Sequence, residues 1–136
     1  MLARRRSVFV CMDDGSRRRR LAGLVHNFGE AEVLGEGPVG TAGLRGLVAR
    51  KPDIGVIVAA EHELTGLALA RRVREVIPGV ALLTVGVGDP GSASGASIAR
   101  ATDRTLPAGA SIVDIAEALR ALANSIGWAE ERHHTA

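Results

Sequence analysis

Two adjacent carboxylates, Asp13 and Asp14, directly follow the apolar run Ser7 to Met12. A short apolar run of this kind predicts a buried strand, which would leave both carboxylates at its carboxyl end. Ligands of parallel sheets bind outside that edge, and hard cations such as Mg²⁺ prefer carboxylate oxygens. The pair is therefore a candidate cation site. An equally good alternative is that the two side chains cap a helix beginning near Ser16 and interact with its dipole.

A second pattern, Gly35 to Gly40 (GEGPVG), has the spacing of a dinucleotide-binding loop, and Glu61 follows about twenty residues later. Three features argue against that chemistry. The strand expected before it is short and is not the first of the fold, Pro38 removes a backbone donor, and the chain leaves no room for a substrate domain. We interpret the segment as a glycine-rich turn and expect no cofactor.

The basic residues are concentrated near the start of the chain, where residues 1–20 hold seven arginines and two aspartates although the net charge is only +2. Arg17 to Arg20 could contact phosphates. If they lie in the first turns of a helix, however, four consecutive residues point in all directions and at most two face one partner. Two phenylalanines, one tryptophan and no tyrosine also make a base-stacking surface improbable. Nucleic-acid binding by this chain alone is not predicted.

Nothing in the sequence indicates catalysis. The histidines and serines form no identifiable nucleophile and base set, and no serine has the strand-turn-helix context of a hydrolase. Cys11 is the single cysteine, so it has no partner for an internal disulfide and no neighbouring metal ligand. We predict a protein that is not an enzyme and has no metal centre.

Short apolar runs alternate with segments of helical periodicity. Strands are expected at Ser7–Met12, Glu32–Leu34, Ile54–Ala60, Val80–Val85 and Arg104–Leu106, and helices at Ser16–Phe28, Thr41–Arg50, Leu67–Ile77, about Ala93–Ala101, and from a Ser111 cap to about Ile126. Parallel strands need crossover helices, so the order predicts an α/β fold with a five-stranded parallel doubly wound sheet of flavodoxin-like order 2-1-3-4-5.

The chain length fits one domain. Residues 1–126 would form it, and residues 127–136 would be a frayed tail or the start of a linker. No apolar run is long enough to cross a bilayer or to form a signal-peptide core, so the expected location is the cytoplasm, with no membrane contact.

Three stretches, VCMDDGS, EVLGEGPVGTAGLRGLVARKPDIGVIV and TGLALARRVREVIPGVALLTV, resemble the receiver domain of response regulators, especially the NarL type. The likeness covers most of the chain and is ungapped from about Glu32 to Val80. It implies the same fold and a role in signalling or transcriptional regulation. In that family two acids after the first strand hold Mg²⁺, an aspartate ending the third strand accepts phosphate, a Thr or Ser ends the fourth strand, and a lysine ends the fifth.

Only the acidic pair, Asp13 and Asp14, carries over from the family pattern. The acceptor position falls on Val58, the hydroxyl position on Gly86 with Thr84 two residues earlier, and the lysine position on Pro107 or Ala108. Glu61 is three residues beyond the acceptor position, and a shift of that size would break the match on both sides. The resemblance thus implies an atypical receiver without the phosphate-accepting aspartate.

Two functions remain open. The first is a phosphorylation-independent module that acts by dimerising or by docking to a partner protein or a fused output domain. The second is a small-molecule sensor whose pocket at the carboxyl edge would be lined by Asp13, Asp14, Ala59 and Gly86. For the first, we expect a homodimer through the final helix, Ser111 to Ile126, because the glycine-rich segment Gly86 to Thr102 should cover its apolar stripe poorly.

Overall fold

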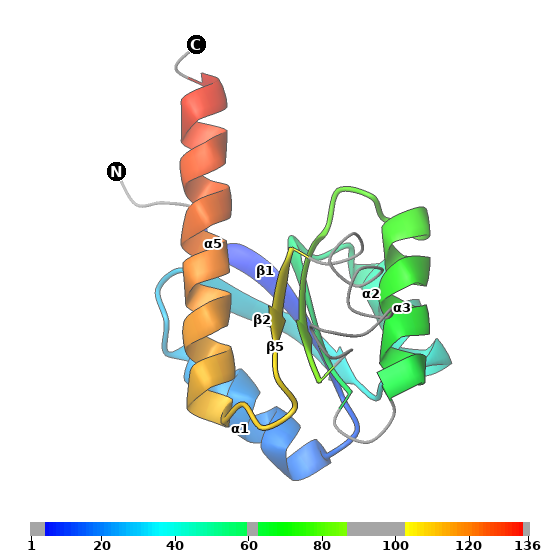
Figure 1. Ribbon diagram of the computed structural model, residues 1–136. Coiled ribbons are helices and arrows are strands. Elements are labelled where there is room, and N and C mark those ends of the chain that lie inside the picture. The colour runs from blue at the N-terminus through cyan, green and yellow to red at the C-terminus, as the bar shows by residue number, and fades with distance from the viewer. Residues whose placement is uncertain (1–4, 60–62, 87–102, 135–136) are drawn as a thin grey trace.

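The computed structural model describes residues 5–59, 63–86 and 103–134, without the side chains of residues 63, 64 and 127–134 (Figure 1). The elements are β1 (Arg6–Met12), α1 (Gly15–His26), β2 (Ala31–Gly37), α2 (Thr41–Arg50), β3 (Ile54–Val58), α3 (Glu63–Val76), β4 (Ala81–Val85), β5 (Arg104–Leu106) and α5 (Ile112–His134). All strand pairs are parallel, in the order β2-β1-β3-β4-β5. The predicted fold class and strand order are confirmed.

Helices cover both faces of the sheet, α1 and α5 on one and α2 and α3 on the other (Figure 1). Side chains alternate along each strand, so each face has its own core. Leu21 of α1 and Leu119 of α5 are fully buried against Val10 and Val56 on the first face. Leu47 of α2 and Val73 of α3 are fully buried on the second. The central strand β3 is buried at every residue, as its β-branched run IGVIV predicts.

The ends of several helices follow from single residues. Asp14 caps α1, and its carboxylate accepts from the backbone N–H groups of Ser16 and Arg17, each at 3.1 Å. Lys51 ends α2 in the left-handed conformation, with φ 47°, directly before Pro52. The predicted cap at Ser111 is confirmed, because its hydroxyl accepts from the Asp114 N–H at 3.0 Å.

The glycine segment differs from the prediction. Gly35 and Gly37 belong to β2, which is longer than the predicted Glu32–Leu34 strand, so only residues 38–40 remain for a turn before α2. Half of the pattern GEGPVG therefore lies in a strand and not in the predicted turn. The physical reason is Phe9: a Cβ on Gly35 would lie 2.9 Å from its ring, and one on Gly46 would lie 2.2 Å from it. These glycines make room for an aromatic ring.

The final helix differs too. We expected it to end near Ile126 and the chain beyond to fray, but α5 continues to His134. Its 23 residues correspond to about 35 Å at the usual rise. Figure 1 shows its last turns rising past the top of the sheet, beyond the reach of the other described elements. The helix predicted near Ala93–Ala101 lies outside the described residues, as does Ala60.

Candidate functional site

The carboxyl edge of the sheet is closed by a row of apolar side chains. Met12 is the register partner of Val58, Val58 of Val85, and Val85 of Leu106, so the last residues of β1, β3, β4 and β5 lie side by side. Met12, Val58 and Val85 are almost fully buried, and Leu106 packs against the same core. The row belongs to the core beneath α1 and α5 and carries no group able to attack or bind phosphate.

Just beyond this row, three backbone segments pack closely. Gly86 follows β4 with a φ of 72°, a conformation that favours glycine. A Cβ placed there would lie 3.3 Å from both Cα and Cβ of Ala108 and 3.5 Å from the Ala59 carbonyl oxygen. The loops after β3, β4 and β5 therefore meet at Gly86. A Thr or Ser at this position would be strained and crowded.

Thr84, the other candidate for the hydroxyl, lies one residue inside the end of β4. It is fully buried and is the register partner of Ile57 and Thr105. Because side chains alternate along a strand, its hydroxyl is on the opposite face from Val58 and Val85. Thr84 therefore does not belong to the terminal row.

Both acidic residues at the end of β1 accept backbone hydrogen bonds. Asp14 caps α1, which is the structural alternative predicted from the sequence. Asp13 Oδ1 accepts from the Val39 N–H at 2.9 Å and so connects the end of β1 to the loop between β2 and α2. Both residues are exposed. Their oxygens hold loops together at the carboxyl edge of the sheet.

A guanidinium occupies the same edge. Arg18 Nη1 donates to the carbonyl oxygen of Met12 at 2.8 Å, and Nε donates to Glu36 Oε1 at 3.0 Å. Sequence reasoning expected at most two of the four arginines to face one partner and did not single out Arg18. A signal was available, because Arg18 stands one helical turn after Asp14 and long helical side chains point back toward the N-terminus.

Cys11 is fully buried beneath this edge, beside α2. Burial raises the pKa of its thiol to about 12, with the positive Arg18 opposing and the negative Asp13 adding to the increase. The thiol is therefore neutral and unreactive at physiological pH. It acts as a small core residue, as predicted.

The residues at this edge do not fit a bound Mg²⁺. The residue that ends β3 at this edge is the apolar Val58, and Arg18 brings a fixed positive charge beside the acidic pair. In the described ranges, no group of three or more His, Cys, Asp or Glu side chains is placed to hold a metal ion. Glu61, the other acid near the acceptor position, lies outside the described residues.

Comparison with known proteins identifies the architecture. No protein-family model matches the chain, and no curated protein matches its sequence. Solved structures do match. The REC domain of the response regulator AraT from Geobacillus stearothermophilus is 16% identical, with a TM-score of 0.69 over 98% of this chain and 99% of that one. The response regulator domain of Thermotoga maritima CheB is also 16% identical, with a TM-score of 0.77 over 91% and 97%.

The signal receiver domain of NarL from Mycobacterium tuberculosis is 20% identical, with a TM-score of 0.62 over 88% of this chain and 97% of that one. The chain has the fold of a response-regulator receiver domain. The receiver fold extends over nearly the whole chain, so the carboxyl edge described above corresponds to the same edge of a receiver. Within the described residues, no helix of this receiver fold is long and apolar enough to cross a membrane.

Proposed function

We propose that this protein is a receiver-like regulatory domain that works without phosphoryl transfer, through protein–protein contacts in signalling or transcriptional regulation. The receiver fold supports the regulatory role. The observation that carries the proposal is the apolar row Met12, Val58, Val85 and Leu106, which occupies the end of the sheet where the resemblance places the phosphate acceptor. Transfer to a receiver needs a carboxylate nucleophile, and valine has none.

The distribution of positive charge supports the same proposal. The chain has one lysine, Lys51, which ends α2 just before β3 begins and so lies near the amino edge of the sheet. The position expected for the lysine, at Pro107 or Ala108, carries no charge. Among the described residues, Arg18 is a cationic group at the carboxyl edge, and its hydrogen bonds to Met12 and Glu36 hold it to β1 and β2.

A phosphorylated relative provides a contrast. The response regulator from Burkholderia pseudomallei, solved with a phosphorylated aspartic acid and a calcium ion, is 19% identical with a TM-score of 0.66, over 96% of this chain and 75% of that one. The fold is therefore compatible with phosphoaspartate when the acceptor is present. Val58 at this chain's acceptor position supports the proposal that the fold acts here through surfaces that contact other proteins.

The small-molecule sensor receives no support from the packing. Its pocket would need space between Ala59 and Gly86, but the Ala59 carbonyl and Ala108 already lie within van der Waals contact of a Cβ built on Gly86. Asp13 and Asp14 are engaged with the backbone of Val39 and of α1. Protein contact is therefore the better proposal.

For the partner we propose a second copy of this chain, docked through α5, but not through the apolar stripe named from the sequence. The stripe is not poorly covered as expected, because Ile112, Ile115 and Leu119 are buried inside the domain at 7%, 0% and 0% exposure. Its other two members, Leu122 and Ile126, are partly buried against the same core. The exposed side of α5 instead borders a hollow of about 410 Å³ between α5 and the edge strand β5. Val113, 55% exposed, lies on the same helix.

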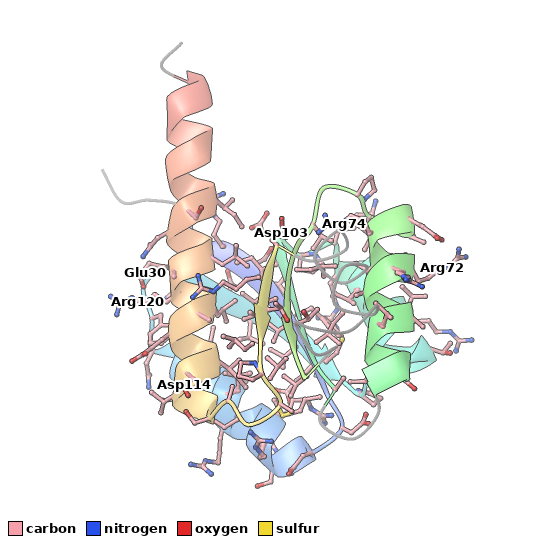
Figure 2. The ribbon with its side chains drawn as sticks, viewed as in Figure 1. Glu30, Arg72, Arg74, Asp103, Asp114 and Arg120 are labelled. Atoms are coloured by element: carbon pink, nitrogen blue, oxygen red, sulfur yellow. The ribbon has the colours of Figure 1, made fainter. Side chains whose placement is uncertain are left out.

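The charges around this hollow are self-complementary. Arg104 lies on the β5 side and Asp114 and Glu117 lie on the α5 side. The lining also includes Leu106, Pro107 and Ala110. Figure 2 shows Asp114 at the beginning of α5. A two-fold contact presents the same patch from both subunits, so Arg104 of one copy can meet the carboxylates of the other. Sedimentation over a range of concentrations tests this partner, and intact mass after exposure to a small phosphodonor tests the proposed function.

A further inference from the structure

Arg18 differs from its neighbours in the arginine run. Its side chain is only 23% exposed and its ion-pair partner Glu36 is 30% exposed. It bridges β1 and β2 by donating to the Met12 carbonyl and to the Glu36 carboxylate. Arg19 instead donates to the Gly15 carbonyl of its own helix at 3.2 Å, and Arg20 is exposed. Arg18 is therefore built into the edge of the sheet, whereas Arg19 and Arg20 are not.

The surroundings of Arg18 are acidic. Glu36 is its direct partner, while Asp13 holds the β2–α2 loop through Val39 and Asp14 begins the same helix as Arg18. The charges of Arg18 and Asp13 have opposite effects on the pKa of the Cys11 thiol, so both charges lie near that thiol. Without the guanidinium, the partly buried Glu36 carboxylate would lose its ion-pair partner and the Met12 carbonyl its side-chain donor.

We propose that Arg18 is a built-in cation, whose guanidinium supplies at the carboxyl edge the positive charge that a divalent ion would otherwise have to supply. The guanidinium never loses its charge in the physiological range, and its donors have fixed geometry. A bound Mg²⁺, by contrast, leaves when its concentration falls. The edge therefore keeps one arrangement whatever the Mg²⁺ concentration. This inference does not depend on Val58 or on whether the protein accepts phosphate.

Thermal unfolding with MgCl₂ or with NaCl of the same ionic strength tests the proposal. The variants are Arg18→Gln and the matched control Arg20→Gln, which removes the same charge from an exposed position two residues later. For wild type and for Arg20→Gln, we expect the melting temperature in MgCl₂ to equal that in NaCl. Arg18→Gln should melt about 4 °C below Arg20→Gln in NaCl. MgCl₂ should recover at least half of that loss, because the ion can then neutralise the Glu36 carboxylate that has lost its arginine partner.

Three results would overturn the proposal. The first is saturable stabilisation of the wild type by Mg²⁺, and the second is an Arg18→Gln variant with the same melting temperature as Arg20→Gln. The third is an Arg18→Gln variant whose melting temperature does not rise in MgCl₂. If Arg18→Gln fails to fold, the double variant Arg18→Gln/Glu36→Gln decides. Removing the orphaned carboxylate should restore folding and leave the protein insensitive to Mg²⁺, whereas an unfolded double variant contradicts the account. No phosphodonor is used, so failure here is distinct from failure of the proposed function.

Discussion

Val58 lies directly opposite Val85 in the register of β3 and β4, and the two side chains are 4% and 1% exposed. Each is the last residue of its strand, and both pack into the core beneath α1 and α5. The end of the sheet is therefore held by the same apolar contacts as its interior. The consequences can be tested by changing one side chain at a time.

A carboxylate at position 58, which the proposed function assigns to the lost phosphate acceptor, should destabilise the folded protein. Val58→Asp places an unpaired charge in the apolar row, which we expect to lower the free energy of unfolding by about 3 kcal/mol or more. Val58→Ala, which only removes two methyl groups, should lower it by about 2 kcal/mol. Urea unfolding followed by circular dichroism measures both. A Val58→Asp variant as stable as Val58→Ala would contradict the buried, apolar environment of this position.

Gly86 should tolerate no side chain. Gly86→Ala requires a positive φ at a non-glycine residue and a contact of 3.3 Å with Ala108, and should cost about 1 to 3 kcal/mol of stability. Gly23 provides the control, because it lies within α1 with nothing within 4 Å of a Cβ. Gly23→Ala should stabilise the protein by about 0.5 to 1 kcal/mol. If Gly86→Ala and Gly23→Ala shifted the melting temperature in the same direction, the special requirement for glycine at position 86 would be refuted.

The buried Cys11 thiol should make stability fall at high pH. Its pKa is raised from 9.0 to about 12 in the folded protein, so the unfolded chain loses the thiol proton first as pH rises. Between these pH values the free energy of unfolding should decrease by up to about 1.4 kcal/mol per pH unit. The difference between wild type and Cys11→Ala isolates this effect from other groups. Parallel stability–pH profiles for the two proteins would show that the thiol is not shielded.

The proposed dimer should depend on opposite charges across the β5–α5 hollow. Glu117→Arg places like charges opposite Arg104 of the second copy and should weaken self-association at least about tenfold. Asn124→Arg, on the exposed side of the same helix, should have little effect. Sedimentation equilibrium measures both, and the charge swap Arg104→Glu/Glu117→Arg should restore association. A wild-type protein that remains a monomer at high concentration would exclude this partner.

The sequence was sufficient for the fold because its signals were local and repeated. The run IGVIV predicted a central strand covered on both faces, and the Lys51-Pro52 pair marked the end of α2. The course of β2 through Gly35 and Gly37 was not predictable, since the need for glycine arises from the ring of Phe9, which is distant in sequence but adjacent in the sheet. Likewise, the extension of α5 past Ile126 had no clear signal because Gly127 lowers helix propensity.

The candidate site was predictable only in part. The resemblance to receivers assigned Val58 to the end of the third strand, where β3 does end. The cap of α1 by Asp14 was one of two alternatives considered. Arg18 was missed because the sequence alone does not distinguish which of four consecutive arginines points back toward the start of the helix. That distinction depends on the position of the Met12 carbonyl and Glu36, which come together only when β1 and β2 pair.

The most direct test of the central claim is intact-mass spectrometry after incubation with acetyl phosphate and Mg²⁺, with a phosphorylation-competent receiver treated in parallel. The competent receiver should gain a phosphate. This protein should keep its unmodified mass, because the row from Met12 to Leu106 offers no carboxylate where receivers react. A stoichiometric phosphate adduct on this protein, mapped to Asp13, Asp14 or Glu61, would contradict the account.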